Sequence, residues 1–495
     1  MNLNDRHSMQ PLFALLCFWA ILTQPTSALE SRNDNQAKPA NAKPNIVLFF
    51  IDDLGYTDLG CYGSAFYETP VIDQLSKSSV RFTDFYSANP VCSPTRAALM
   101  TGKAPQRVGI TQWINQPNDL HLPLPEVTLG EALGSAGYQT GYIGKWHLGE
   151  KDNQQPSEQG FVWMKSVNRA GQPGSYFFPF KRRNKRTKNA KTYWDVPDLD
   201  DRKEGDYLTD ELTDHALSFI SKHRDQPFFL CFAHYAVHTP IQAPKHLLAK
   251  YQAKASAIRF SGPEFIDERN NSKSRAIQNN PAYGAMMENL DNNVGRVLEH
   301  LKKLELGNNT IVIFTSDNGG LSTLPAKRPG PTSCRPLRAG KGWTYEGGIR
   351  IPLMVAWPNQ IKPGICSTPG ITMDIYPTLL ELAGEKQRPK QHLDGHSLVS
   401  TLRGTPDDEL KNRFLAWTYP HAHGSGHTPS HAIRSGDWKL VHLIDDKTKT
   451  EDRYELYNLR TDLGEQENLA VKQHEKTHEL AGLLSGWLQK TTPKK

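Results

Sequence analysis

Short apolar runs alternate with segments of helical periodicity between about residue 45 and residue 385. Apolar runs of five to seven residues are typical of buried strands, and their alternation with helices predicts an α/β fold. Helices are predicted at 71–78, 127–136 and 285–304. The predicted strands are 45–51, 138–143, 227–233, 310–314 and 353–357.

The pattern changes beyond about residue 410. The segments 414–419, 431–444 and 454–459 predict antiparallel strands, and 474–489 predicts a final amphipathic helix. We therefore predict two domains, a catalytic α/β domain at 44–405 and a C-terminal α+β subdomain at 406–495.

Residues 160–205 interrupt the alternation. This stretch is aromatic and basic, and its most basic part is 181–188. We interpret it as a solvated surface insertion, in preference to a basic wall beside an active site that would receive an anionic polymer.

The N-terminus resembles an export signal. Residues 12–22 form a short apolar run, and the small residues 26–28 suit cleavage after Ala28. The run is too short to span a bilayer comfortably, and no later segment is long and apolar enough, so no stable membrane span is predicted. We predict a signal peptide at 1–28, a polar linker at 29–43 and an exported protein. An uncleaved anchor is the alternative.

Composition and cysteine usage limit the class. Hydrophobic residues make up 37% and charged residues 22%, with a formal net charge of +6, which suits a soluble protein with anionic substrates and predicts no nucleic-acid partner. Of six cysteines, Cys17 would leave with the signal. If Cys92 is reserved for chemistry, four remain for disulfides of undetermined pairing. No CxxC pair occurs, which argues against a thiolate zinc site.

Hard oxygen donors follow two of the predicted strands. Asp52 and Asp53 come after 45–51, and Asp317 and Asn318 come shortly after 310–314. Ligands of open α/β sheets bind beyond the carboxyl ends of the strands, and oxygen-only ligation favours Ca²⁺ or Mg²⁺ over zinc. Either pair alone would be interpreted as a turn. Two pairs after buried strands predict a metal site.

Basic and proton-transferring residues also follow strands. Lys145 and His147 come after 138–143, His238 comes after 227–233, and Lys341 lies in a later Gly-rich segment. Together they form a set that could bind an anion and move a proton. Each histidine alone would more often be structural, which is the interpretation we give His234.

The segment from Cys92 to Arg96 reads Cys-Ser-Pro-Thr-Arg. Ser93 and Pro94 suggest an N-cap and a first helical turn. Cys92 would then lie beside a helix N-terminus, where anions are favoured. Without the other motifs an unmodified buried cysteine would be the default.

Three motifs carry a resemblance to a known family. Cys92–Arg96, with the Ala-Ala-Leu-Met-Thr-Gly that follows, resembles the signature of type I sulfatases. Gly-Lys-Trp-His-Leu-Gly at 144–149 resembles the second signature, and 340–350 is similar to the lysine-bearing segment. The resemblance runs from about Pro44 into the C-terminal subdomain and is greatest to the arylsulfatase A and N-acetylgalactosamine-6-sulfatase group. It implies an alkaline-phosphatase-like mixed sheet between helices, with a smaller subdomain of antiparallel sheet plus helix.

The resemblance also implies a cofactor set. A maturation enzyme would oxidise Cys92 to formylglycine. One Ca²⁺, in preference to Mg²⁺, would be ligated by the formylglycine and by Asp52, Asp53, Asp317 and Asn318.

Catalytic roles follow from the same resemblance. The hydrated formylglycine, helped by Asp317, would attack sulfur, and His147 would then take a proton so that sulfate leaves. His238 and Lys341 would bind the sulfate and protonate the leaving oxygen. Lys145 would contact sulfate and formylglycine, and Arg96 would hold the formylglycine and the carboxylates.

The implied substrate is a sulfated carbohydrate or an aryl sulfate. Four histidines after 414–419 either reach over the active site or form a polar loop, and these are His421, His423, His427 and His431. A phosphate or phosphonate monoester hydrolase of the same superfamily is the first alternative function, and a non-catalytic carbohydrate-binding protein is the second. The sequence does not predict the sugar, the sulfate position, exo or endo action, or the oligomeric state.

Overall fold

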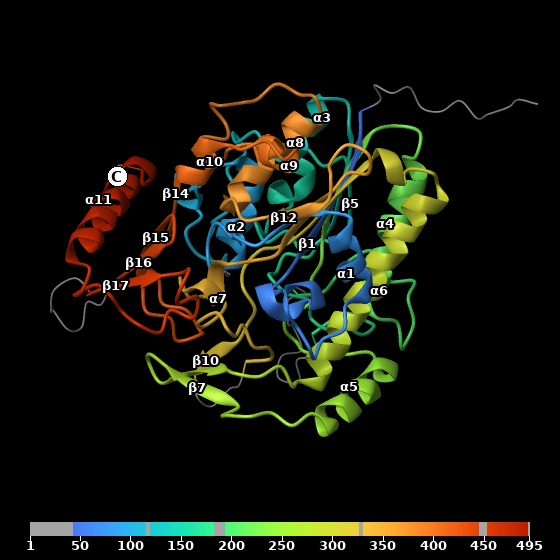
Figure 1. The fold of residues 1–495 in the computed structure, drawn as a ribbon. Coiled ribbons are helices and arrows are strands. Elements are labelled where there is room, and N and C mark those ends of the chain that lie inside the picture. Colours follow the sequence, from blue (N-terminus) through green and yellow to red (C-terminus); the bar gives the residue numbers. More distant parts are fainter. Residues whose placement is uncertain (1–42, 115–118, 183–193, 326–329, 445–452, 494–495) are drawn as a thin grey trace, which may run out of the picture. The chain divides into compact units, whose positions relative to one another are not determined.

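The computed structural model describes residues 43–114, 119–182, 194–325, 330–444 and 453–493 (Figure 1). The predicted signal peptide, the linker up to residue 42 and most of the basic run at 181–188 lie outside the described residues. In the described part of the chain, no helix has both the length and the apolar character needed to cross a membrane.

The centre of the fold is an eight-stranded mixed sheet. Five neighbouring strands, from β9 to β5, run parallel, whereas β11 is antiparallel to both β9 and β2. This arrangement confirms the predicted α/β class. In sheet order the strands are β12 (Gly364–Cys366), β2 (Val80–Phe82), β11 (Leu353–Ala356), β9 (Thr310–Ser316), β1 (Asn45–Ile51), β6 (Phe228–Ala233), β4 (Gln139–Gly144) and β5 (Trp163–Lys165).

Alternate side chains of β1 enter two separate apolar cores. Val47, Phe49 and Ile51 pack into one, while Ile46, Leu48 and Phe50 pack into the other, as expected for a strand buried on both faces. Figure 1 shows the two groups of helices that complete these cores on opposite sides of the sheet. The first core includes α1 (Pro70–Lys77), α4 (Leu208–Lys222), α5 (Lys245–Ala257) and α6 (Pro281–Lys303), and the second includes α2 (Cys92–Thr101), α3 (Leu129–Ser135), α8 (Ile375–Leu382) and α9 (Val399–Leu402).

The predicted insertion is partly built into the sheet. β5 pairs in parallel with β4, with Trp163 opposite Gly141. The interpretation of 160–205 as a surface insertion is therefore wrong for its first residues. The three-residue strand is too short, and too exposed at Met164, to give an apolar run in the sequence.

Two smaller sheets complete the first part of the chain. Both pair short segments of two to four residues. The three-stranded sheet consists of β10 (Thr323–Pro325), β8 (Ser272–Arg275) and β7 (Phe265–Glu268), and the two-stranded sheet of β13 (Gly370–Ile371) and β3 (Phe85–Tyr86).

The C-terminal part is a four-stranded antiparallel sheet with one helix packed on it, as predicted. The single stretch predicted at 431–444 is wrong, because it forms a hairpin of two strands. Gly436, with φ of 57°, supplies the left-handed residue that the turn requires. A short helix, α10 (Asp408–Asn412), precedes the sheet, and the boundary at 405/406 stays a prediction. The elements are β14 (Phe414–Tyr419), β15 (Ser430–Ser435), β16 (Trp438–Leu443), β17 (Arg453–Asn458) and α11 (His474–Thr491).

A buried ion-pair network fixes this sheet against the strand ends of the first part. The Lys439 ammonium of β16 lies 2.9 Å from Glu346 of α7 (Glu346–Ile349) and 2.8 Å from Glu465, and all three side chains are fully buried. Burial with the nearby Glu346 carboxylate raises the pKa of Glu465 to about 7, although Lys439 opposes the rise. Lys439 thus pairs with both buried carboxylates, and Arg350 pairs with Glu346 as well, at 3.1 Å.

Replacing Lys439 with methionine is expected to cost about 3–5 kcal/mol of unfolding free energy, because the buried Glu465 loses its lysine partner and Glu346 is left with Arg350, 3.1 Å away. Urea unfolding of Lys439→Met measures the loss. Lys472 pairs with Glu467 at the surface, and its side chain is 69% exposed. The control variant Lys472→Met is therefore expected to lose less than about 1 kcal/mol of unfolding free energy. Equal stability losses in the two variants would contradict the role of the network.

The five cysteines within the described ranges are free. The four that the sequence left available for disulfides are Cys61, Cys231, Cys334 and Cys366, and the structure pairs none of them. Cys231 lies inside β6, and Cys334 is buried with its thiol directed at the Gly320 carbonyl at 3.5 Å.

Candidate active site

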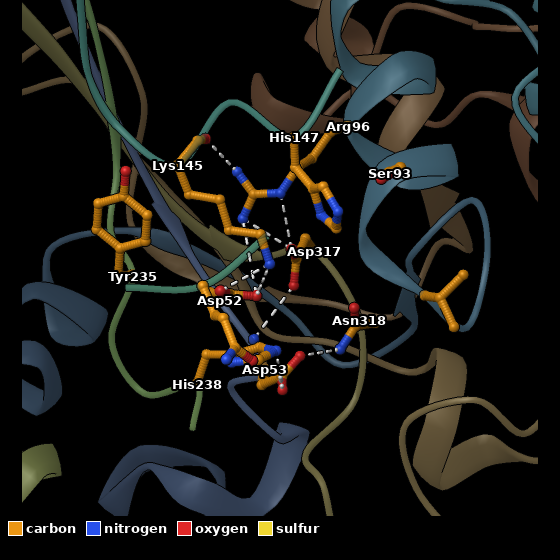
Figure 2. Close-up of polar contacts among 12 residues, drawn as sticks. Asp52, Asp53, Ser93, Arg96, Lys145, His147, Tyr235, His238, Asp317 and Asn318 are labelled. Carbon is orange, nitrogen blue, oxygen red and sulfur yellow. Dashed lines mark hydrogen bonds and ion pairs between the residues drawn. The ribbon is translucent and has the colours of Figure 1, made fainter. Parts of the chain in front are cut away.

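The two acidic pairs meet at one edge of the sheet (Figure 2). β1 and β9 are parallel neighbours with Ile51 opposite Ser316, so the residues that follow each strand emerge side by side. The backbone amide of Asp53 donates to Asp317 Oδ1 at 3.2 Å, and the side-chain amide of Asn318 donates to Asp53 Oδ1 at 2.8 Å. The arrangement at the strand ends that the sequence predicted is therefore observed.

Several acceptor atoms in this group suit a cation. Asp53 Oδ2 and Asn318 Oδ1 are buried and have no hydrogen-bond partner. One ligand atom from each of Asp52, Asp317 and Cys92 lies within 4.8 Å of the other two. Burial, with the repulsion of Asp317 and Asp53, raises the pKa of Asp52 despite the opposing charge of Lys145. A hard divalent cation would satisfy the two acceptors and relieve the repulsion, so these residues fit such an ion.

Three basic side chains surround the carboxylates. Lys145 Nζ lies 2.7 and 2.8 Å from the two oxygens of Asp52, and Lys341 Nζ lies 2.6 Å from Asp53 Oδ1. Arg96 donates to Asp317 Oδ2 from Nε at 2.9 Å and to the Lys145 carbonyl from Nη1 at 2.7 Å. Burial would raise the pKa of Asp53 and of Asp317, but Lys341 and Arg96 respectively hold these pKa values below the usual range. Both carboxylates are therefore held as anions.

His147 has a defined tautomer. Its Nε2 lies 2.8 Å from the Ile114 carbonyl, which can only accept, so Nε2 carries the hydrogen and Nδ1 keeps its lone pair. Nδ1 is buried and has no hydrogen-bond partner. Burial, with the nearby charge of Lys145, lowers the pKa of His147 well below its usual value. The residue is thus a neutral imidazole with a free basic nitrogen.

His238 approaches the same group from β6. Its Nδ1 donates to the Thr239 carbonyl at 2.8 Å, and its Nε2 lies 3.6 Å from Asp53 Oδ2. Burial and the Lys341 charge lower the pKa of His238 to about 3. Of the two histidines after β6, His238 therefore joins the site. His234 packs against Phe232 in the core, with ring centroids 3.9 Å apart, in line with its structural interpretation.

Cys92 is the first residue of α2 rather than a residue before it. The N-cap is Val91, and Ser93 does not cap the helix, because its hydroxyl accepts from the Ile114 amide at 3.0 Å. That part of the prediction is wrong, since a loop distant in sequence binds the serine. Arg96 lies one turn after Cys92, so both side chains lie on the same face of α2. The N-terminus of this ten-residue helix still favours an anion at position 92.

A cavity of about 410 Å³ opens onto Cys92, His147, His238 and Lys341. Sequence reasoning identified these four and proposed His423 as an alternative, but missed most of the remaining lining. Some of the missed residues adjoin identified ones, as Val91 adjoins Cys92, whereas others, such as Trp113 and Trp194, come from separate loops and carry no motif. The missed residues are Val91, Trp113, Ile114, Gly171, Gln172, Trp194, Leu321, Leu324 and Gly424.

The four-histidine cluster separates in the structure. His423 lines the cavity, whereas His421 bonds to Thr111 Oγ1 at 3.0 Å and His431 bonds to Thr418 Oγ1 at 2.8 Å. His427 is buried against Trp343. Of the two interpretations of the cluster, the active-site one therefore applies to His423 alone.

Gly171, from the insertion, lies directly against the His147 ring. A Cβ at this position would lie 2.2 Å from His147 Cε1. Gly171→Ala must therefore displace His147, and a shift of this kind is expected to lower kcat about 100-fold. Steady-state kinetics with a melting curve measure both effects. Gly134→Ala on α3, whose Cβ would meet nothing closer than 3.8 Å, is the control. A Gly171→Ala enzyme with unchanged kcat would contradict the close packing.

Comparison with known proteins now places the chain in a family. The family model for sulfatases matches residues 44–385, and the model for the N-sulphoglucosamine sulphohydrolase C-terminal region matches residues 339–492. The chain belongs to the sulfatase family and is a sulfuric ester hydrolase.

Individual relatives cover most of the chain. It is 34% identical to human arylsulfatase A in an alignment of length 399 that covers 76% of this chain and 71% of that protein. It is 32% identical to a sulfatase of Formosa agariphila over 97% of this chain and 94% of that protein. The crystal structure of Ps i-CgsB superposes with a TM-score of 0.73 at 30% identity, covering 90% of this chain and 92% of that one. These likenesses confirm the alkaline-phosphatase-like fold that the motifs implied.

Proposed function

We propose that this sulfatase hydrolyses sulfate monoesters of sulfated carbohydrates, with formylglycine at position 92 and one Ca²⁺ held by Asp52, Asp53, Asp317 and Asn318. The observation that carries the proposal is the convergence of Cys92 with Asp52 and Asp317 within 4.8 Å, beside two lysines and two histidines. Ps i-CgsB has also been crystallised with k-i-k-neocarrahexaose, a sugar ligand, which supports a carbohydrate substrate here.

The modified residue and the cation supply chemistry that no ordinary side chain offers. Hydrated formylglycine supplies one hydroxyl to attack sulfur and a second whose deprotonation releases sulfate, which splits the reaction into two steps. Ca²⁺ would withdraw charge from the oxygens bound to it. Asp53 Oδ2 and Asn318 Oδ1, the two buried acceptors without partners, support oxygen ligation.

The remaining residues bind the anion and move protons. Lys145 and Lys341 place two ammonium groups beside the carboxylates, where they would bind the sulfate oxygens. His147 Nδ1, with its free lone pair, would accept the proton that sulfate release requires. His238 lines the cavity beside Lys341, and these two would contact the leaving oxygen. Arg96 would orient Asp317 through its two contacts with that carboxylate.

Export through residues 1–28 and modification by a maturation enzyme belong to the same proposal. The compartment would be periplasmic, secreted or lysosome-like. N-terminal sequencing of the exported protein should give a start after Ala28, and an intact N-terminus would refute the cleavage.

Parallel assays with a sulfate monoester, a phosphate monoester and a phosphonate test the reaction type. We expect the sulfate ester to be hydrolysed with the highest kcat/KM, because the lysines and histidines lie where the sulfatase motifs place them. Faster phosphate or phosphonate turnover would favour the alternative hydrolase of the superfamily. A panel of defined sulfated oligosaccharides would then identify the sugar and the sulfate position.

A further inference from the structure

The outer part of the catalytic cavity is aromatic rather than charged. Trp113 and Trp194 both line it, and Trp113 remains 38% exposed. The two residues come from separate loops, Trp113 from the connection between α2 and α3 and Trp194 from within the insertion at 160–205. Aromatic lining beside an anion-binding site suits a ligand that has apolar faces as well as an anionic group.

A cation from the same insertion is packed against one of these rings. The Arg182 guanidinium carbon lies 4.3 Å from the centroid of the Trp194 ring. This is a cation–π contact, and it holds both side chains in one arrangement. Arg182 is thereby positioned next to Trp194, which lines the cavity. Within the described residues Lys181 has no such ring contact, and the carboxylate oxygen nearest to its ammonium group, on Asp200, is 4.0 Å away.

We propose that Trp113, Trp194 and Arg182 form a subsite for the sugar residue that neighbours the one losing its sulfate, and that Arg182 selects neighbours bearing an anionic group. This subsite rests on the proposed function and adds a preference for an anionic group on the neighbouring sugar. Tryptophan rings match the apolar faces of sugar rings, and a guanidinium binds sulfate or carboxylate oxygens in a bidentate manner.

The size and position of the cavity agree with this assignment. Its volume of about 410 Å³ lies within the range of cavities that hold drug-sized ligands, so it admits more than a sulfate ion. Cys92, His147 and Lys341 define the reacting end, and the two tryptophans supply lining that the reaction does not use. The insertion thus belongs to substrate recognition. The sequence alone instead favours a solvated surface insertion over a wall beside the active site.

The test compares three disaccharides that share one scissile sulfate. The neighbouring sugar is neutral in the first, carries a second sulfate in the second, and carries a carboxylate in the third. Wild type, Arg182→Gln, Trp194→Ala and the matched control Lys181→Gln are assayed on each. The two anionic substrates separate sulfate from carboxylate as the group recognised.

For Arg182→Gln we expect kcat/KM to fall about tenfold on the preferred anionic disaccharide, the size of one ordered charge contact, and to fall less on the neutral one. Trp194→Ala should lower kcat/KM on all three disaccharides, chiefly through KM. Lys181→Gln, which removes the same charge one residue away, should match wild type.

Two results would overturn the subsite. One is an equal loss in Arg182→Gln on neutral and anionic neighbours, which would mean that the arginine only supports Trp194. The other is an equal effect of Lys181→Gln, which would mean a diffuse charge effect. If wild type hydrolyses none of the disaccharides and no aryl sulfate, the proposed function itself fails, and this outcome is distinct from both.

Discussion

Cys92→Ala is expected to lose sulfatase activity by at least about 1,000-fold, because the variant has no group that can become the nucleophile. Its fold should persist. Cys92 is buried at the start of α2, and alanine removes one atom, at a stability cost of about 1 kcal/mol. Turnover of an aryl sulfate and of a sulfated sugar, with circular dichroism and a melting curve, separates lost chemistry from lost structure.

A second buried cysteine provides the control. Cys231 lies inside β6, is fully buried and is free, so Cys231→Ala makes a similar small cavity away from the nucleophile. We expect this variant to retain most of its activity at a comparable loss of stability. Substantial turnover by Cys92→Ala would refute the assignment of the nucleophile, whatever the control shows.

Loss of the cation is also expected to lower activity strongly. Asp53→Asn keeps the shape of the side chain but removes its negative charge. In the wild type, Oδ1 of this carboxylate lies 2.6 Å from Lys341 Nζ, and Oδ2 has no hydrogen-bond partner. We expect the variant to bind less than stoichiometric Ca²⁺ and to lose about 100-fold or more in kcat/KM. Chelator treatment of the wild type should give the same loss, reversible with Ca²⁺.

Metal content must be measured directly, since activity alone cannot separate the cation from the carboxylate. Elemental analysis of the purified protein and a calcium-dependent shift of the melting temperature are the two measurements. Asp291→Asn is the control, because Asp291 is buried but accepts only backbone amides of Val71 and Ile72. Full Ca²⁺ occupancy and activity in Asp53→Asn would contradict the ligand set.

The central strands and their chemistry could be predicted because they depend on local pattern. A run such as 45–51 is apolar at every position, which a strand buried on both faces requires, and it matches β1 residue for residue. In a parallel sheet the residues after each strand emerge at one edge, so Asp52 and Asp317 could be expected to meet before any coordinates were known.

The second layer of the site depends on contacts between distant segments, which no local pattern encodes. Gly171 is an ordinary loop glycine in the sequence, and only the fold shows that its missing side chain makes room for His147. Ser93 has the sequence of an N-cap, yet its hydroxyl accepts a hydrogen bond from the Ile114 backbone amide, 21 residues further along the chain. Nothing in the sequence distinguishes the four histidines that follow β14 from one another, but of these only His423 lines the cavity.

Peptide mass spectrometry across position 92 tests the central claim most directly. The enzyme should be produced with the maturation enzyme present, and its specific activity should be measured on the same sample. We predict an aldehyde in place of the thiol at Cys92, in a fraction that rises and falls with activity. Fully active protein in which residue 92 is an unmodified cysteine would contradict the account.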